Sequence, residues 1–395
     1  VLSSHPAHAA SISGDRIVYR RILGLLDAGH EVGLAAFCRP DERDRAEELR
    51  DRLVGLDLLP PPRGALPLRK RMTCGISFVP PPFSATASTA MSRLVGDRVE
   101  EHRYDAVLAE YSESGQHVFR NPALPAVRVV MSCHRCATVA ARKQIEVLGG
   151  SSRTLYRRIW FTALRHFEFK MYESADRLLV LTPEERNELL SYHLNVPTTV
   201  IPSGVDCDAF RRPSGLEPRE KALVFTGHFA DAPNRDGMLW LIGHIWPRLT
   251  ALHPDLRLYI VGPGVTPPLR EAARRDPRLI LTGYQDDVRP FLYRSMAFVH
   301  PMRMGSGLRG KVLEAMASEL PVVSTALGME GIPAQTGRHC LIADQADLMA
   351  DQIDLLLTDG GLRQSIAREA RRLAEERFSW DYGVRRLETV LCEVT

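Results

Sequence analysis

The sequence predicts an α/β protein built from two doubly wound domains, each with a parallel sheet covered by helices on both faces. The length is the first reason, because 395 residues exceed the roughly 100–200 residues of one domain. The second is that short apolar runs alternate with stretches of helical apolar spacing in both halves of the chain. The third is the segment 211–218, where Pro, Gly and polar residues separate the two series.

The first half shows the alternation less cleanly than the second. We expect a strand near the start, a helix at 16–28, and strands at 31–38, 106–109, 127–131 and 178–181. Gly29 follows the predicted helix, and glycine after the last helical residue is a common C-terminal signal.

The second half gives a longer series of elements. We expect strands at 222–229, 256–261, 278–282, 296–300 and 321–325. We expect helices at 236–252, 268–275, 288–293, 307–318, 347–357 and 362–376. Strands that alternate with helices of this length favour a parallel sheet buried on both faces.

Composition excludes several classes of protein. Hydrophobic residues make up 45% and charged residues 25%, which is the balance of a globular chain. Lys and Arg number 51 against 48 Asp and Glu, too even a balance for a partner that is a nucleic acid. Seven scattered cysteines do not form a disulfide framework, and no run reaches the ~20 apolar residues of a membrane helix. The opening residues lack the features of a secretory signal, so we expect a cytoplasmic protein.

A glycine-rich turn in the second half carries the clearest chemistry. Gly305-Ser306-Gly307 follows a predicted strand and opens a predicted helix, where exposed N–H groups and the helix dipole favour an anion. Arg309 and Lys311 bring two full charges to the same end, which suits a diphosphate. Glu314, one turn later, is placed to accept two ribose hydroxyls. The alternative is an amphipathic helix with these charges on its solvated face.

The run GSGLRGKVLEAMASELPVVST at 305–325 resembles the donor-binding motif of the retaining glycosyltransferases of family 4, which have the GT-B fold. Other segments are similar to that family as well: TVIPSGVDCDAF at 199–210, VFTGHFADAPNRDGMLWL at 224–241, SADRLLVLTPEERNELL at 174–190 and FSWDYGVRRLETVL at 378–391.

The resemblance implies two Rossmann-like domains that face each other across a cleft. Residues 1–202 would form the acceptor-binding domain, with 379–395 crossing back onto it, and 203–378 would bind the nucleotide sugar. The implied reaction transfers a sugar with retention from a UDP-sugar or GDP-sugar to a hydroxyl of a glycan, a lipid-linked molecule or a small molecule. It implies no metal and no other cofactor, and it leaves the oligomeric state open.

The family also implies roles by position. The donor-binding residues would be Gly305, Ser306, Gly307, Leu308, Arg309, Lys311, Glu314, Gly227 and Arg235. Ser306 stands where the family has the first acid of its E-x7-E pattern, which leaves the sugar open, and the N–H groups of the glycine turn are expected to substitute. The family often has an Arg in the loop after the first strand of this domain, where this sequence has His228. Arg235 is expected to supply that charge to a phosphate or, alternatively, to lie in a solvated loop.

His134 follows a predicted strand at its carboxyl end, which is the ligand edge of such a sheet, and the family has a catalytic His there. It joins Arg309 and Lys311 as the expected catalytic residues. The flanking Cys133 and Cys136 have no second pair at zinc-site spacing, so we expect no metal.

Acceptor-side residues are expected at two further strand ends. Gly14, Asp15 and Arg16 follow the first strand, where Asp15 either contributes to the ligand loop or caps the helix. Glu110 and Tyr111 end another strand and are expected to contact the acceptor.

The basic and aromatic segment Arg153–Tyr172 has two interpretations. It is either a core helix with a charged outer face, which its apolar spacing favours, or a segment that contacts an anionic membrane or grips a lipid-linked acceptor.

Two alternatives to sugar transfer remain. One is a nucleotide-sugar 2-epimerase of the same fold, and the other is a sugar-nucleotide-binding module without turnover. A nicotinamide dehydrogenase is excluded, because no G-x-G-x-x-G follows a strand and opens a helix.

Overall fold

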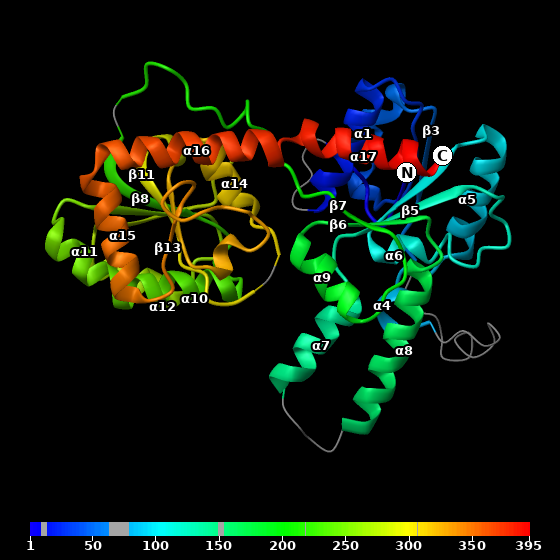
Figure 1. Ribbon diagram of the computed structural model, residues 1–395, viewed down its shortest axis with the longest axis horizontal. Coiled ribbons are helices and arrows are strands. Elements are labelled where there is room, and N and C mark those ends of the chain that lie inside the picture. The colour runs from blue at the N-terminus through cyan, green and yellow to red at the C-terminus, as the bar shows by residue number, and fades with distance from the viewer. Residues whose placement is uncertain (9–13, 63–78, 149–153, 218, 306) are drawn as a thin grey trace. The chain divides into compact units, whose positions relative to one another are not determined.

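The computed structural model describes residues 1–8, 14–62, 79–148, 154–217, 219–305 and 307–395, without the side chains of 14, 143–148 and 154–159. It divides into two compact units (Figure 1). The first unit is Val1–Pro202 with Gly383–Thr395, and the second is Ser203–Tyr382. Each unit holds one parallel sheet with helices on both faces, which confirms the predicted α/β class.

The first unit contains a seven-stranded sheet in the order β3-β2-β1-β4-β5-β6-β7. Its strands are β1 (Leu2–Ser3), β2 (Gly33–Phe37), β3 (Gly55–Leu59), β4 (Ala106–Glu110), β5 (Arg128–Cys133), β6 (Arg177–Val180) and β7 (Thr198–Val200). Every neighbouring pair is parallel. Order reversal at β1 places β1 and β4 side by side, the kind of switch point where α/β sheets bind ligands.

Helices cover both faces of this sheet. They are α1 (Gly14–Asp27), α2 (Arg43–Ala46), α4 (Pro81–Ser84), α5 (Thr89–His102), α6 (Ser112–Gly115), α7 (Ala137–Leu148), α8 (Thr154–Tyr172), α9 (Pro183–Ser191) and α17 (Trp380–Val394), with 3-10 turns η1 (Pro40–Glu42) and η2 (Glu47–Arg52). α1 and α17 bury one apolar cluster against the sheet, whereas α5, α8 and α9 bury the other. The last helix therefore begins in the second unit and packs in the first.

The second unit contains a six-stranded parallel sheet in the order β10-β9-β8-β11-β12-β13. Its strands are β8 (Glu220–Thr226), β9 (Arg257–Val261), β10 (Leu279–Gly283), β11 (Ser295–His300), β12 (Val322–Ser324) and β13 (Leu341–Ile342). Its helices are α10 (Ala232–Trp240), α11 (Trp246–Leu252), α12 (Pro267–Arg275), α13 (Arg289–Arg294), α14 (Gly310–Ala317), α15 (Ala346–Thr358) and α16 (Gly360–Phe378), with the π segment η3 (Leu241–Ile245) and the 3-10 turn η4 (Leu327–Met329).

Successive residues of a central strand enter different apolar clusters, as a sheet buried on both faces requires. In β8, Leu223 and Phe225 join the cluster of α10, α11 and α15, whereas Ala222 and Val224 join that of α14 and α16. Figure 1 shows α14 and α16 on one side of this sheet and α10 to α12 on the other. The carboxyl ends of both sheets' strands are thereby held rigidly.

Several predicted elements have different bounds, and two of these differences lie close to the second unit's site. The helix predicted at 236–252 starts earlier, at Ala232, and its middle turn Leu241–Ile245 is a π segment. The strand predicted at 222–229 ends at Thr226, and the chain then turns at Gly227.

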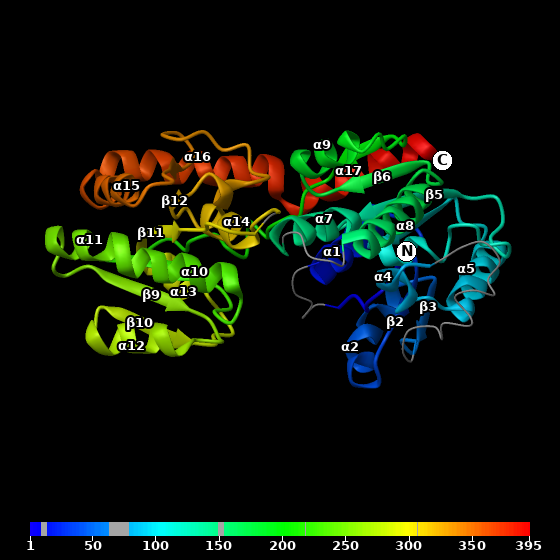
Figure 2. The same ribbon diagram turned by 90° about the horizontal axis from the view of Figure 1, so that it is seen from below.

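The predicted helix Arg153–Tyr172 is observed as α8 from Thr154, and residue 153 lies outside the described residues. Leu164 and Met171 are buried in the first core, whereas Arg165 and Lys170 are exposed. This part of α8 is a core helix with a charged outer face. α7 lies beside it in both views (Figures 1 and 2).

Glu168 ties these two helices together. Its fully buried carboxylate accepts the backbone N–H groups of Ala137 and Thr138 at 2.8 and 2.7 Å, at the first turn of α7. The hydroxyls of Thr138 and Tyr172 donate to it at 2.6 and 2.8 Å. Burial raises the pKa of Glu168 against these hydrogen bonds, which lower it. The carboxylate therefore caps α7 from the neighbouring helix.

We expect Glu168→Ala to lower the free energy of unfolding by about 3 kcal/mol or more, because the substitution leaves buried donors without a partner. Lys170→Ala on the exposed face of the same helix is the control and should change it by less than about 1 kcal/mol. Urea denaturation followed by circular dichroism measures both. Equal stabilities for the two variants would contradict the capping role.

Candidate functional site

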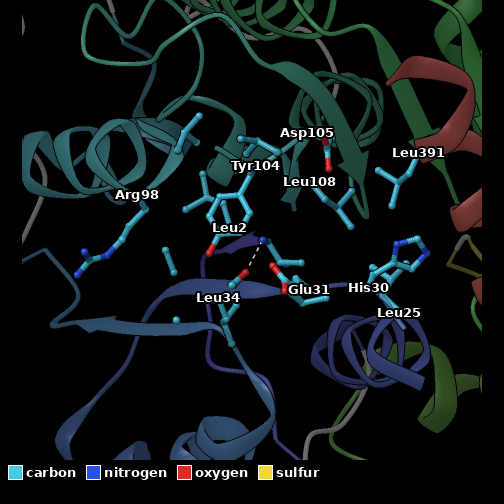
Figure 3. Close-up of a pocket in the computed structure, with 18 of the residues that line it drawn as sticks. Leu2, Leu25, His30, Glu31, Leu34, Arg98, Tyr104, Asp105, Leu108 and Leu391 are labelled. Atoms are coloured by element: carbon cyan, nitrogen blue, oxygen red, sulfur yellow. Dashed lines mark hydrogen bonds between the residues drawn. The ribbon is translucent and has the colours of Figure 1, made fainter. Parts of the chain in front are cut away.

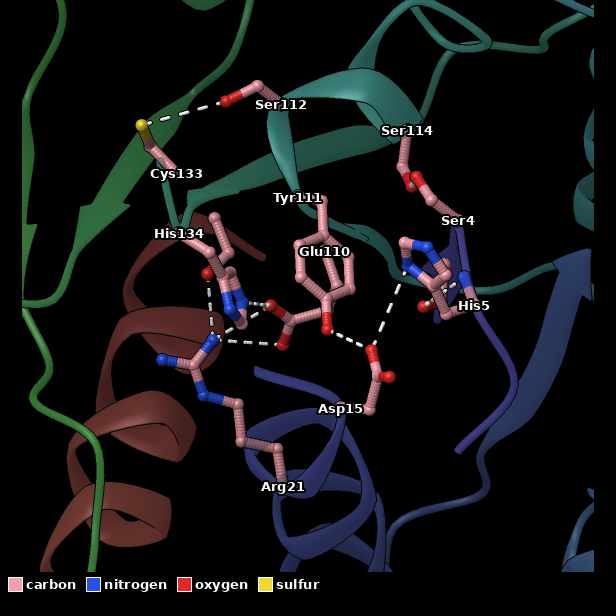
Figure 4. A network of polar contacts seen from close by, with 12 residues as sticks. Ser4, His5, Asp15, Arg21, Glu110, Tyr111, Ser112, Ser114, Cys133 and His134 are labelled. Atoms are coloured by element: carbon pink, nitrogen blue, oxygen red, sulfur yellow. Dashed lines mark hydrogen bonds and ion pairs between the residues drawn. The ribbon is translucent and has the colours of Figure 1, made fainter. Parts of the chain in front are cut away.

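Polar side chains of the first unit gather where α1 meets the carboxyl ends of β4 and β5 (Figure 4). β4 ends at Glu110, which is in register with Ser132 on β5, and His134 follows the end of β5. Arg21 reaches the same place from α1. The parallel pairing thus brings Glu110 and His134 together at the ligand edge of the sheet.

The centre of this cluster is a buried ion pair. Arg21 Nη1 donates to both carboxylate oxygens of Glu110 at 2.9 Å and to Ser132 Oγ at 2.8 Å. Glu110 is 0% exposed and Arg21 3%. Burial raises the pKa of Glu110, but Arg21 and His134 outweigh burial and bring it down to about 2. The carboxylate is therefore ionised at neutral pH.

His134 is held by the same carboxylate. Its Nε2 lies 2.7 Å from Glu110 Oε2, and since an ionised carboxylate only accepts, the proton is on Nε2. Nδ1 is buried and has no partner among the described residues. The side chain is only 6% exposed. The neutral ring would therefore present an acceptor at Nδ1 and the protonated ring a donor.

Tyr111 and Asp15 flank this histidine. The Tyr111 ring packs on the His134 ring with 4.3 Å between centroids, and its hydroxyl donates to Asp15 at the start of α1. Tyr111 has φ 68°, a positive value that residues other than glycine rarely adopt. Burial, followed by Asp15, raises the pKa of Tyr111, so the phenol stays neutral.

The remaining residues predicted at this edge lie close to Asp15 in the chain. Gly14 begins α1, and Arg16 follows Asp15 with partial exposure. His5, which the sequence did not single out, places Nδ1 3.8 Å from Asp15 Oδ1 and packs on the edge of the Tyr111 ring.

The predicted contact of Glu110 with an acceptor is wrong. The carboxylate is fully buried, and both of its oxygens already accept hydrogen bonds from Arg21 or His134. Glu110 acts on the site through His134, so it is a positioning residue. The sequence analysis missed Arg21. An Arg in a predicted helix carries no sign that it will pair with a buried carboxylate far away in the chain.

In the second unit the predicted residues meet at the start of α14. The helix begins at Gly310 with Arg309 as N-cap, three residues later than the predicted start at 307. Gly305 and Gly307 have φ 100° and 87°, in the left-handed region that a right-handed helix excludes. The glycines therefore form a turn before the helix. Ser306 lies outside the described residues.

Lys311 is half-buried at this turn. Its Nζ donates to Asn234 Oδ1 at 2.8 Å and lies 4.5 Å from the centre of the Phe225 ring. A Cβ on Gly227 would lie 2.7 Å from Nζ, so only glycine leaves room for it. Burial, followed by the charge of Arg309, lowers the pKa of Lys311 to about 7. The site thus holds a cation that loses its charge easily.

Arg309 is a second half-buried cation with free donors. Its Nε and Nη2 are buried and have no partner among the described residues. Burial lowers the pKa of Arg309, whereas the carboxylate of Glu330 raises it. Gly305 again makes room, since a Cβ there would lie 2.7 Å from Nη2. These unpaired N–H groups are those of an anion site.

Two polar residues of this half were missed. Asn234 bonds Lys311, whereas its predicted neighbour Arg235 donates to Ala230 O at 3.3 Å in its own loop. Glu330, beyond β12, accepts the N–H of Gly307 at 2.8 Å. Both contacts join segments far apart in the chain, and no local pattern signals them.

Leu308 packs at the edge of the second unit's core, and Glu314, partly buried one turn into α14, favours the charged form of Lys311. Arg235 has no described contact with Arg309 or Lys311, and its placement on a phosphate stays a prediction.

A hollow of about 250 Å³ lies elsewhere in the first unit (Figure 3). It is lined by the amino ends of the strands, including Leu2, Leu34 and Tyr104, and by Leu391 of α17. The amino group of Val1 donates to Gly33 O at 2.6 Å beside it. This is the edge opposite Glu110 and His134, and none of the predicted site residues lines it.

Two absences concern the part of the chain that the structure describes. None of its helices combines the length and apolarity needed to span a bilayer. Nor does it bring three His, Cys, Asp or Glu side chains together in a way that would hold a metal ion.

Two family models match the sequence. The model described as Glycosyltransferase Family 4 matches residues 15–209, and that described as Glycosyl transferases group 1 matches residues 220–359.

Individual relatives extend over most of the chain. It is 21% identical over 364 residues to an uncharacterized 44.6 kDa protein in the cps region of Klebsiella pneumoniae, a match that covers 89% of each. It is 27% identical over 324 residues to D-inositol 3-phosphate glycosyltransferase of Salinispora tropica, which covers 73% of this chain but only 64% of that protein.

Solved structures share the fold. HepE of Anabaena in complex with UDP is similar with a TM-score of 0.69 and 13% identity, over 99% of both chains. The same protein in complex with UDP-glucose gives a TM-score of 0.65. The two parallel sheets, these structural relatives and the two family models agree, so the chain belongs to the glycosyltransferases with the GT-B fold, with a family 4 domain followed by a group 1 domain.

Proposed function

We propose that the protein is a retaining glycosyltransferase that moves a sugar from a nucleoside diphosphate to an acceptor hydroxyl without a metal ion. The observation that carries this proposal is Arg309, whose Nε and Nη2 are buried without a described partner beside the glycine turn. Each buried unpaired donor costs roughly 1–3 kcal/mol, and a bound anion would remove that cost. In a glycosyltransferase the fitting anion is the donor diphosphate.

The second unit would hold the donor by charge. Arg309 and Lys311 bind the diphosphate, the glycine turn lets it approach closely, and Glu314 accepts the ribose hydroxyls. As the sugar leaves, negative charge grows on the phosphate, and the same cations stabilise it. One such contact is worth about 3 kcal/mol, or about 100-fold in rate.

Retention follows from attack on the same face as the leaving group. The bond between the anomeric carbon and the phosphate oxygen breaks as the acceptor oxygen bonds to that carbon. The acceptor proton passes to the leaving phosphate, so this route needs no carboxylate nucleophile of the kind that retaining hydrolases use.

The first unit would contribute the cluster around His134. Its Nδ1, like Nη2 of Arg21 in the same cluster, is buried without a described partner, and Nδ1 would contact the donor sugar near the reacting carbon. Asp15 and Tyr111 would lie on the acceptor side. The acceptor is a glycan, a lipid-linked molecule or a small molecule; the Salinispora relative is named for an inositol phosphate acceptor.

A two-step assay tests the proposal. A thermal-shift screen with UDP-glucose, UDP-N-acetylglucosamine, UDP-galactose and GDP-mannose identifies a donor by the rise in melting temperature. Release of free nucleoside diphosphate is then measured with and without acceptors. Release that needs an acceptor supports transfer, conversion of the donor alone indicates the 2-epimerase, and binding without any reaction indicates a binding module.

Arg309→Ala and Lys311→Ala should each weaken the binding of UDP at least about tenfold and lower transfer about 100-fold or more, because each removes a cation from the diphosphate. Isothermal titration and the release assay measure the two effects. Arg303→Ala is the matched control, because Arg303 precedes the same turn but pairs with Asp236 at 2.7 Å on the surface. Normal transfer by both site variants would remove the assignment.

Binding of UDP should take up a proton above pH 7. In the empty site the pKa of Lys311 is about 7, and a bound diphosphate favours its charged form. The dissociation constant should therefore rise with pH between 7 and 9, by up to about tenfold per unit. Titration at pH 8 in buffers of different ionisation enthalpy counts the protons. Lys311→Met should bind weakly and show no uptake; uptake that persists in this variant would assign the proton elsewhere.

Glu110→Gln should lower kcat about tenfold or more without changing the affinity for UDP, because it disturbs His134 and leaves the donor cations untouched. The variant also leaves Arg21 buried without a counter-charge, so circular dichroism must show that the fold survives. Glu113→Gln, next to the cluster in sequence but without its contacts, is the control. A kcat equal to that of the wild type would contradict the positioning role.

A further inference from the structure

Glu330 places a carboxylate on the same turn that carries the half-buried cations. It follows η4 and β12, and its Oε2 accepts the backbone N–H of Gly307 at 2.8 Å. The side chain is partly buried, and the other carboxylate oxygen has no partner among the described residues. One oxygen is therefore fixed to the backbone and the other is open.

Glu330 is not explained as a counter-charge for Arg309. Glu330 raises the pKa of Arg309 through its charge, yet the two side chains form no ion pair, and Nε and Nη2 of Arg309 stay without a described partner. A carboxylate also repels a phosphate. Its open oxygen can only accept hydrogen bonds, so its ligand must be a donor such as a hydroxyl.

The order of charges along the turn and helix suggests which hydroxyls these are. Glu330 is bonded to Gly307, ahead of the helix, whereas Glu314 lies beyond Lys311 inside it. Arg309 and Lys311 lie between these two points in the chain. A nucleoside diphosphate sugar has the same order, with a ribose on one side of its phosphates and a sugar on the other.

We propose that Glu330 binds hydroxyl groups of the transferred sugar and so helps to select it. This inference rests on the proposed function and deepens it by assigning a specificity residue to the donor. Hydrogen bonds to a charged acceptor are about twice as strong as neutral ones. A site built to accept a hydroxyl discriminates against a sugar that lacks it, because the acceptor is then left unpaired.

The test compares a nucleotide with its sugar conjugate. The sugar nucleotide that most raises the melting temperature in the panel above is titrated into wild type, Glu330→Ala and Glu330→Gln, and so is the corresponding free UDP or GDP. We expect Glu330→Ala to weaken the binding of the sugar nucleotide about tenfold or more. The affinity for the free nucleotide should change by less than about twofold. Glu330→Gln keeps a carbonyl acceptor and should fall between wild type and Glu330→Ala.

A second measurement links Glu330 to the sugar itself. Deoxy analogues of the same donor, each lacking one hydroxyl, should bind wild type more weakly at one position at least, and Glu330→Ala should lose that difference. If Glu330→Ala loses equal affinity for the free nucleotide and for its sugar conjugate, Glu330 only shapes the turn. An equal gain for both would show that it blocks the phosphates, and either result overturns the proposal.

A failure of the proposed function can be distinguished from a failure of the role proposed for Glu330. If wild type binds none of the sugar nucleotides, the donor assignment itself is wrong. If wild type binds and transfers but discriminates the analogues as Glu330→Ala does, only the role of Glu330 is lost.

Discussion

Two half-buried cations without a full counter-charge are the constraint on which the second unit depends. Lys311 is held by an amide oxygen and an aromatic ring, and Arg309 keeps buried donors unpaired. Neither arrangement fully offsets the free energy that a charged group loses when it leaves water. The fold tolerates this because a large two-sided core fixes β8 and α14 on either side. Under the proposed function, the site would be organised for an anion before one arrives, which is what electrostatic catalysis requires.

The first unit also buries a cation, but it pairs that cation with a carboxylate. Arg21 is more deeply buried than the second unit's cations, but Glu110 accepts two hydrogen bonds from it. Glu110 neutralises the charge of Arg21, although Arg21 Nη2 keeps no described partner, and the carboxylate fixes His134 through Nε2. The second unit thus offers cations without a full counter-charge, and the first offers an oriented histidine ring. This division fits a reaction in which charge grows on the phosphate while the sugar carbon must be positioned.

The sequence predicted what depends on local pattern. Apolar runs of strand length predicted the central strands of both sheets, and the glycine-rich segment 305–307 after a predicted strand indicated the start of one helix. Its first residue was misplaced, because the conformation of Gly305 and Gly307 shows only in φ. Arg21, Asn234 and Glu330 could not be found, since their partners lie 89, 77 and 23 residues away. Such contacts are decided by packing, and no local preference encodes them.

Two glycines leave room for the ends of these cations where the structure places them. At Gly227 a single Cβ would lie 2.7 Å from Lys311 Nζ, and at Gly305 it would lie as close to Arg309 Nη2. A side chain at either position would push the cation outward, where water would hydrate it and weaken its hold on a phosphate. Gly305 also adopts φ 100°, which other residues rarely accept. The chemistry of the site therefore depends on residues that make no polar contact through a side chain.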